Sequence, residues 1–203
     1  MTERNKDKVY QVYNEIIDWF DLNRSKDLSM EKFYLNFIQK YLKPKSKILD
    51  VGCGTGEPIA QFLITEGYEV TGIDASIKMI ELCKQRFPKS TWILADMRTL
   101  DLNEQYHAVI AWHSLFHLPH DDQRMTLKLL ASFVDKQGLL IFTTGPELDE
   151  VWSDNGGYDL YHASLSTEEY KQILADNQLK VLAHKIRDPE CGDATVWVAQ
   201  KTS

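Results

Sequence analysis

The chain has 203 residues, 43% of them hydrophobic, and a formal net charge of −7 at pH 7. This length predicts one domain with enough apolar side chains to bury a sizeable core. The acidic balance argues against broad electrostatic capture of nucleic acid, and no apolar run approaches the length that spans a membrane. Three cysteines without C-x-x-C spacing, and a charged N-terminus without an apolar secretory segment, predict a cytoplasmic protein.

The first 44 residues are expected to form a helical cap. Apolar residues recur at three- and four-residue steps between residues 9 and 20, and again from Phe33 to Tyr41. A break is expected at residues 23–25, and Pro44 should end the second helix. Two helices ahead of a nucleotide-type motif indicate a cap over a ligand rather than a separate domain.

From residue 46 onwards, strand and helix signals alternate. Strands are expected at 47–51, 69–73, 91–95, 108–112 and 139–143, with a helix in most of the intervals between them. Ser76 should cap the helix that stops before Pro88, and Asp121 or Asp122 should cap the helix that covers 123–134. Such alternation predicts a parallel sheet with helices on both faces.

The C-terminal part departs from this alternation. Residues 152–164 are rich in Gly and aromatic residues without a clear period, which predicts a loop or lid. Residues 166–169 have the spacing of a capping box and should open a helix that ends near Asp176. Strands at 179–186 and 194–199 are joined by a link too short for a crossover helix, so they should be antiparallel neighbours. We therefore expect a single domain, 1–203, with a cap (1–44), a core (45–145) and a C-terminal part (146–203).

The most informative segment is 48–56, in which an apolar strand runs into three glycines with the spacing G-x-G-x-G. Gly52 and Gly54 permit close approach of the main chain to a ligand, whereas Gly56 could serve helix packing. A dinucleotide motif would read G-x-G-x-x-G, and a phosphate-binding loop would end in G-K-[ST]. Glu57, at the expected start of the next helix, would repel a phosphate but suit the positive end of a ligand. The turn therefore predicts a site for an adenosine-bearing cation such as S-adenosylmethionine.

Carboxylates stand at the ends of the first three expected strands, where an open α/β sheet binds its ligands. Asp74 should accept hydrogen bonds from both ribose hydroxyls, although a carboxylate favoured by the following helix dipole is the alternative. Asp96 should accept from the adenine amino group with Met97 against the ring, or be an ordinary strand-ending residue. Asp50 would bind the ligand's ammonium, directly or through a water, or hold the glycine turn, and the sequence does not separate these roles.

These motifs resemble those of the class I S-adenosylmethionine-dependent methyltransferases. The glycine turn resembles their first motif, Asp74 the acidic residue of their second, and Asp96-Met97 the pair that flanks the adenine. The likeness covers residues 45–145 well. Segments 161–166 and 188–192 are similar to those of small bacterial-type members and name no substrate. The resemblance implies a Rossmann-like α/β fold whose seven-stranded mixed sheet has six parallel strands and an antiparallel last strand between the fifth and sixth. It also implies S-adenosylmethionine as the cofactor.

The residues expected to contact the cofactor lie in the cap and at the strand ends: Trp19, Arg24, Asp50, Gly52, Cys53, Gly54, Glu57, Asp74, Ala75, Met79, Asp96, Met97, Trp112 and His113. Trp19 and Arg24 would close over the methionine end, with Arg24 pairing with its carboxylate. The alternative is a core tryptophan and a solvated arginine. Cys53 has no base or cation beside it in the sequence, so we expect a small space-filling side chain rather than a reactive thiol.

Two histidines after the fourth strand, His113 and His117, are the candidate catalytic residues. Methyl transfer from a sulfonium mainly needs alignment and exclusion of water, and a base is needed only if the nucleophile must lose a proton. One hypothesis is that His113 or His117 acts as this base. The alternative is that His113 shapes the adenosine pocket and that His117 packs or caps the following helix. Tyr158, Tyr161 and His162 are the candidate contacts for the methyl acceptor, unless the tyrosines fill an apolar cluster.

No metal is expected. The grouping of His117 with 120–122 crowds its ligands onto an expected helix start, without a fourth partner at standard spacing. The function most consistent with these patterns is methyl transfer from S-adenosylmethionine to a small-molecule acceptor, without nucleic-acid or membrane partners, by a monomer or homodimer. The alternatives are a noncatalytic S-adenosylmethionine-binding module, an NAD-dependent oxidoreductase, and a transferase of another sulfonium group, such as an aminopropyl group.

Overall fold

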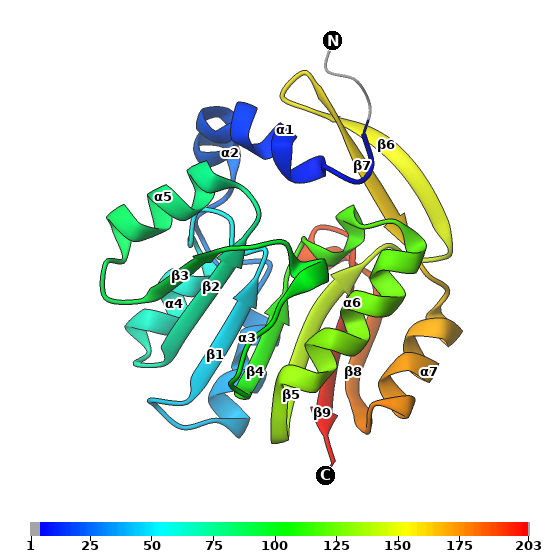
Figure 1. The fold of residues 1–203 in the computed structure, drawn as a ribbon. Coiled ribbons are helices and arrows are strands. Elements are labelled where there is room, and N and C mark those ends of the chain that lie inside the picture. Colours follow the sequence, from blue (N-terminus) through cyan, green and yellow to red (C-terminus); the bar gives the residue numbers. More distant parts are fainter. Residues whose placement is uncertain (1–4, 203) are drawn as a thin grey trace.

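Seven strands form one mixed sheet in a computed structural model that describes residues 5–202 (Figure 1). The strands are β1 (Lys47–Val51), β2 (Glu69–Asp74), β3 (Thr91–Leu94), β4 (Tyr106–Ala111), β5 (Val134–Thr144), β8 (Leu179–Asp188) and β9 (Ala194–Lys201). Their order is β3-β2-β1-β4-β5-β9-β8. The first five pair in parallel, and β9 runs antiparallel between β5 and β8. The predicted fold class is therefore confirmed, including the antiparallel last strand.

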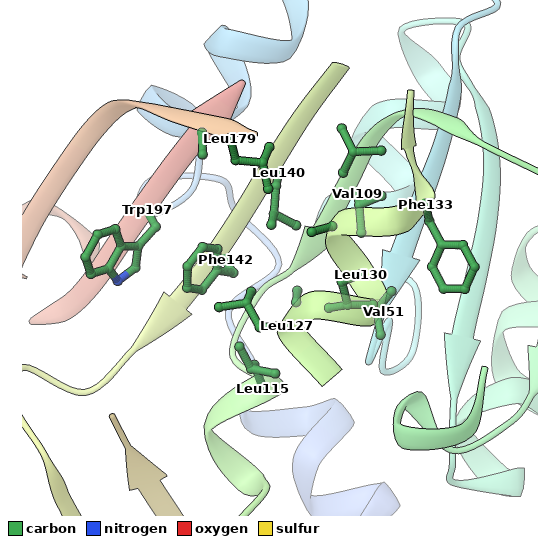
Figure 2. Close-up of a cluster of buried hydrophobic side chains, with 14 of the residues drawn as sticks. Val51, Val109, Leu115, Leu127, Leu130, Phe133, Leu140, Phe142, Leu179 and Trp197 are labelled. Atoms are coloured by element: carbon green, nitrogen blue, oxygen red, sulfur yellow. The ribbon is translucent and has the colours of Figure 1, made fainter. Parts of the chain in front are cut away.

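Helices cover both faces of this sheet because successive strand residues point to opposite sides. On one face, α6 (His120–Phe133) and α7 (Thr167–Asp176) pack on Val109, Leu140 and their neighbours. Figure 2 shows the α6 part of this cluster, where Leu127 and Leu130 lie against the sheet. On the other face, α3 (Lys32–Tyr41), α4 (Ile59–Thr65) and α5 (Ile77–Arg86) pack on alternate residues such as Ile110. With helices packed on both faces of the sheet, the carboxyl ends of the parallel strands all lie at the same edge.

The cap consists of α1 (Val9–Glu15) and α2 (Ile17–Asn23), which lie over the edge where the parallel strands end (Figure 1). The break expected near 23–25 is confirmed, because α2 ends at Asn23 and α3 begins at Lys32. A second break at Ile16 was not predicted, since the apolar spacing continues through it. Asp21 of α2 forms a bidentate ion pair with Arg86 of α5, and this pair joins the cap to the core.

Residues 152–164, predicted as a loop or lid, lie at the expected edge of the sheet but form a regular hairpin and not a loop. Its strands are β6 (Asp149–Asn155) and β7 (Tyr158–Ser164), which pair only with each other. Gly156 and Gly157 form the two-residue turn with φ values of 64° and 84°. A Gly-Gly pair between two strands is a hairpin signal because such turns need positive φ at both positions. The prediction was wrong because aromatic content was given more weight than this signal. The hairpin lies over the same edge as the cap (Figure 1).

Most helix ends follow their local signals. Ser76 accepts a hydrogen bond from the backbone N–H of Met79, and the capping box at Ser166 is formed as predicted. The start of α6 is different: Pro119 holds the N-cap position, and Asp121 and Asp122 lie in the first turn without capping it. Single turns of 3-10 helix follow β3, β4 and β8, at Met97–Thr99, Leu115–His117 and Pro189–Cys191. No helix in the described part of the chain is long and apolar enough to cross a membrane.

Candidate functional site

A cavity of about 340 Å³ lies at the carboxyl ends of the parallel strands, between the sheet, the cap and the hairpin. Its volume is in the range of sites that hold one small ligand. The sheet contributes the segments after β1, β2, β3 and β4, as expected for an open α/β sheet. The cap contributes Tyr13, Phe20 and Arg24, and the hairpin contributes Asn155, Leu160 and His162. We call this cavity the cleft.

The glycine turn brings main chain to the cleft wall. Gly52 has φ of 75°, and a Cβ there would collide with the side chain of Ser114, whose Oγ donates to the carbonyl of Val51 at 2.7 Å. Gly54 has φ of 54° and lies next to Phe20 of the cap. Gly56 instead packs against Phe87 and is not part of the cleft lining. The missing side chain at Gly52 therefore makes room for Ser114, and a Cβ at Gly54 would reach Phe20 at 3.7 Å.

Two carboxylates, those of the buried Asp50 and the half-buried Asp74, line the cleft beside this turn. The Oδ1 of Asp74 accepts the N–H of Ser76 at 2.8 Å, and its Oδ2 accepts the N–H of Gly54 at 3.0 Å. Burial raises the pKa of Asp74 to about 6, against the lowering effect of these bonds. Burial also raises the pKa of Asp50 to about 7, and the charge of Asp74 adds to this while Arg24 opposes it. A positively charged ligand group would stabilise both ionised carboxylates.

The carboxylate of Asp96 lies in the cleft wall but is held by an arginine that the sequence reasoning missed. Arg98 donates to both oxygens of Asp96, to Asp122 at 3.0 Å and to the carbonyl of Asp7 at 2.9 Å. These bonds lower the pKa of Asp96, although burial opposes the effect. Asp96 is thus ionised and fixed in place, and an adenine amino group would share it with the guanidinium. Its neighbour Met97 also lines the cleft.

The charge of Glu57 is already balanced within the protein. Its Oε2 lies 3.0 Å from Nζ of Lys26 and 2.9 Å from a guanidinium nitrogen of Arg86. The helix α4 begins at Ile59, so Glu57 belongs to the preceding turn and not to the helix start as expected. Glu57 lines the cleft, but its carboxylate is not a free negative charge, because its two ion pairs join the cap to α5. Local sequence could not show this, because Lys26 and Arg86 are distant in the chain.

The two cap residues expected at the methionine end have different positions. Arg24 lines the cleft, and one of its guanidinium nitrogens donates to Oε1 of the fully buried Glu31 at 2.8 Å. Trp19 is 42% exposed and is not part of the cleft lining. Its indole lies against Gly156 at the hairpin tip, where a Cβ would approach the ring to 2.8 Å. Trp19 therefore joins the cap to the hairpin, and the structure does not bring it to the cofactor site.

His113 and His117 both line the cleft in a neutral state. Burial lowers the pKa of His113 to about 4, with a contribution from Arg24, and that of His117 to about 3. His113 has φ of 49°, and its backbone N–H donates to Oγ1 of Thr143 at 2.8 Å. His117 has both ring nitrogens in use, Nδ1 with the carbonyl of Tyr161 at 2.9 Å and Nε2 with the hydroxyl of Tyr13 at 2.8 Å.

Tyr13 is a cleft residue that the sequence reasoning missed. Because Nδ1 of His117 faces a carbonyl, that nitrogen carries the proton, and Nε2 accepts the hydrogen of Tyr13. Burial raises the pKa of Tyr13, so the phenol stays protonated. The ring of Tyr13 also meets that of Phe20 edge to face at 5.5 Å. The spacing of Tyr13 and Phe20 predicts that both lie on the apolar face of the cap. Nothing in the neighbouring sequence indicates that they line a site.

Of the three candidate acceptor contacts, the structure brings only His162 to the cleft. Alternation along β7 directs Leu160 and His162 to the cleft, while the side chain between them points elsewhere. Tyr161 is 1% exposed, packs with Val9 and donates to Glu150 at 2.6 Å. Tyr158 begins β7 beside the turn and is not part of the lining. The remaining expected contacts that do line the cleft are Cys53, Ala75, Met79 and Trp112.

The fold is similar to that of known methyltransferase domains. A family described as "Methyltransferase domain" matches residues 48–138. The malonyl-[acyl-carrier protein] O-methyltransferase of Anoxybacillus flavithermus is 32% identical over 112 residues, which cover 53% of this chain and 42% of that protein. The dTDP-3-amino-3,4,6-trideoxy-alpha-D-glucopyranose N,N-dimethyltransferase of Streptomyces venezuelae is 31% identical over 108 residues, covering 52% of this chain and 45% of the relative. This chain thus spans less than half the length of either curated relative.

Solved structures agree on the fold. Magnesium protoporphyrin IX methyltransferase from Synechocystis PCC 6803, solved with bound S-adenosylmethionine, superposes with a TM-score of 0.77 over 100% of both chains at 18% identity. Residues 48–138 thus match a methyltransferase-domain family, and the fold of the chain is that of solved S-adenosylmethionine-dependent methyltransferases. The predicted resemblance to these methyltransferases is therefore confirmed.

Proposed function

We propose that this chain transfers a methyl group from S-adenosylmethionine to a small-molecule acceptor in the cleft. The observation that carries the proposal is the pairing of the glycine turn with two carboxylates. Main chain at Gly52 and Gly54 lines the cleft, and Asp74 accepts one backbone N–H on each oxygen. Since a carboxylate has about four acceptor sites, Asp74 keeps capacity for two ribose hydroxyls.

The charges of the cleft also fit this cofactor. Asp50 is a buried carboxylate that would bind an ammonium, and Arg24 is a cation at the cleft wall that would bind a carboxylate. Asp96 and Met97 would flank the adenine, and Ala75 and Met79 would pack on the nucleoside. When bound, S-adenosylmethionine supplies a methyl group on a sulfonium, whose neutral leaving group departs without help from a protein acid.

The protein's part in the reaction is to orient the two reactants and exclude water. The cap and the hairpin cover the cleft, so the reacting atoms would be shielded from solvent. Of the two candidate bases, His113 has the ring nitrogen Nε2 without a partner among the described residues, whereas His117 has none to spare. We therefore assign the contact with the reacting group to His113 and the positioning of Tyr13 to His117.

The acceptor is a small molecule by analogy with the relatives. Their names give a malonyl group on acyl-carrier protein, an amino sugar nucleotide and magnesium protoporphyrin IX as acceptors, which differ too much to select one. The net charge of −7 supports the absence of a nucleic-acid partner. Three unpaired cysteines support a reducing compartment such as the cytoplasm. We expect a monomer or a homodimer, which light scattering would decide.

Calorimetry with two ligands tests the cofactor assignment. The protein should bind S-adenosylmethionine, and NADH should give no heat of binding. Asp74→Asn should weaken S-adenosylmethionine by about 10-fold or more, because an amide offers one acceptor oxygen in place of two. Asp101→Asn, at an exposed position outside the cleft, is the matched control.

Label transfer tests the reaction itself. The protein is incubated with cofactor labelled at the methyl group and a cell extract, and labelled products are identified by mass spectrometry. Binding of the cofactor without any labelled product would favour the noncatalytic binding module. Preference for NADH over S-adenosylmethionine would overturn the proposal and support the oxidoreductase alternative.

A further inference from the structure

Arg24, a cation of the cleft wall, is bonded to a carboxylate that lies outside the cleft lining. Arg24 directly follows α2, and one of its guanidinium nitrogens donates to Oε1 of Glu31 at 2.8 Å. This is the one hydrogen bond of the Arg24 side chain in the described part of the chain, so its other donors are left for a ligand. The charge of Arg24 reaches into the cleft, where it opposes the rise in the pKa of Asp50 and adds to the fall in that of His113.

Glu31 is an unusual residue for its position. It holds the N-cap position of α3, but its side chain makes no capping bond. Its exposure is 0%, and its Oε2 has no hydrogen-bond partner among the described residues. Glutamate is almost never fully buried unless it is paired. Because Arg24 supplies the one ion pair of Glu31 in the described part of the chain, the two side chains form a unit.

The backbone of Glu31 is fixed on both sides. Its N–H donates to the carbonyl of Leu28 at 3.2 Å, and its carbonyl accepts the N–H of Tyr34 at 3.0 Å. The hydroxyl of Tyr34 in turn donates to the buried Asp188, which joins the start of α3 to the link between β8 and β9. Segment 188–192, to which the cofactor contacts assign no role, thus supports the element that carries Glu31.

The pair of Arg24 with Glu31 has a larger effect on geometry than on stability. A buried ion pair contributes little net stability, because the loss of water by both charges offsets their attraction. An arginine that is free to rotate loses conformational entropy when a ligand fixes it. Arg24 has already lost part of this freedom in the folded protein, since Glu31 holds one end of its guanidinium. A ligand that bonds the other donors therefore binds a side chain that is already in place.

Without Glu31, Arg24 would have a competing partner in the cleft. Asp50 lines the same cleft and is buried, yet no ion pair joins it to Arg24 among the described residues. If the two side chains paired, the cation suited to a carboxylate and the anion suited to an ammonium would neutralise each other. The bond to Glu31 keeps these charges apart, and both stay available to the zwitterionic end of an amino acid.

We propose that Glu31 is a positioning residue of the cofactor site, which fixes Arg24 so that the guanidinium meets the carboxylate of S-adenosylmethionine and stays off Asp50. This inference rests on the proposed function, in which Arg24 binds that carboxylate. Glu31 acts through Arg24, since it is not part of the cleft lining. Its negative charge alone would repel a carboxylate, so its contribution is the acceptor atom at the position of Oε1.

Two variants separate the reach of Glu31 from its charge. Glu31→Gln keeps the length and an acceptor oxygen but removes the charge, whereas Glu31→Asp keeps the charge and is one methylene shorter. Calorimetry measures their affinity for S-adenosylmethionine and for 5′-methylthioadenosine, which lacks the amino-acid end. Glu31→Asp should weaken S-adenosylmethionine by about 10-fold, equivalent to about 1.4 kcal/mol, and Glu31→Gln by less than about 3-fold. The affinity for 5′-methylthioadenosine should stay unchanged in both. Glu81→Asp, at an exposed position of α5 outside the cleft, is the matched control.

A double variant shows whether Glu31 acts through Arg24. In the Arg24→Gln protein, Glu31→Asp should cause no further loss of affinity for S-adenosylmethionine. A further loss of about 10-fold would mean that Glu31 acts by another route, and it overturns the inference. So do an unchanged affinity in Glu31→Asp, tighter binding in either single variant, a loss in Glu31→Gln as large as that in Glu31→Asp, and equal losses for the two nucleosides.

A crystal structure of the wild-type protein with S-adenosylhomocysteine needs no variant to fold. Arg24 should bond both Glu31 and the ligand's carboxylate, and an Arg24 side chain paired with Asp50 overturns the inference. The outcomes also separate the inference from the proposed function. Binding of S-adenosylmethionine that is lost in Arg24→Gln but not in Glu31→Asp removes the inference and leaves the proposed function standing. No binding of S-adenosylmethionine to the wild-type protein overturns both.

Discussion

Replacing the carboxylate of Asp50 by an amide should stabilise the protein in alkaline solution. Asp50 is the last residue but one of β1, and its side chain is 3% exposed. Burial, with the charge of Asp74, raises its pKa from 3.8 to about 7. The unfolded chain therefore releases this proton near pH 4, while the folded chain keeps it until about pH 7. Because the folded state binds more protons between these values, the free energy of unfolding falls as pH rises through this window.

The size of the effect follows from the shift. One pKa unit is worth about 1.4 kcal/mol, so a rise of about 3 units removes about 4 kcal/mol above pH 7. At pH 5 only about 1.6 kcal/mol of this has been lost. Asn does not titrate, and any penalty for burying its amide is the same at both pH values. The stability advantage of Asp50→Asn should therefore grow by about 2–3 kcal/mol between pH 5 and pH 8.

Urea unfolding followed by circular dichroism at pH 5 and pH 8, on both proteins, measures this difference. A stability gap that is equal at the two pH values would refute the electrostatic reasoning. Calorimetry at pH 8 adds the functional side, where loss of the contact with an ammonium should weaken S-adenosylmethionine by about 10-fold or more. Unchanged affinity would instead assign Asp50 to holding the glycine turn.

Three further predictions concern the cleft wall. Gly52→Ala should abolish cofactor binding and destabilise the protein by about 1–3 kcal/mol more than Gly157→Ala in urea unfolding. Both glycines have positive φ, but a Cβ at Gly157 meets nothing within 4 Å, so equal effects would contradict a clash at Gly52. Tyr13→Phe should lower stability by about 1–2 kcal/mol, because Nε2 of His117 loses its partner, and an unchanged unfolding midpoint would disprove this. Arg24→Gln should weaken S-adenosylmethionine by about 10-fold or more in calorimetry but leave 5′-methylthioadenosine, which has no carboxylate, unaffected. Equal losses would place Arg24 at the adenosine.

Much of the fold could be predicted because its signals are local. A Ser at the start of a helix, as at Ser76 and Ser166, accepts a backbone N–H within the next turn. The antiparallel pairing of β8 with β9 follows from the short link between them. The prediction failed at residues 152–164, where two local signals disagree. The Gly-rich and aromatic composition favours a loop, whereas the Gly-Gly turn at Gly156 favours the hairpin that is observed.

The cofactor side of the cleft was also accessible from sequence. Carboxyl ends of parallel strands share one edge, so Asp50, Asp74 and Asp96 had to approach one another once their strands were recognised. Their partners were not accessible. The ion pairs of Glu57 and the bond from Arg98 to Asp122 join residues far apart in the chain, and no spacing rule reports such contacts. Only the bond from Arg98 to Asp96 is local, because the two residues are two positions apart.

The amino-acid sequence by itself determined that this chain forms a parallel α/β sheet with a glycine turn and strand-end carboxylates suited to a sulfonium nucleoside. These features depend on backbone conformation and residue order, which are short-range properties. Only the tertiary structure decided which aromatic and imidazole rings face the cleft. That choice depends on how the cap and the hairpin pack over the sheet, and this packing sets the burial that keeps His113 and His162 neutral.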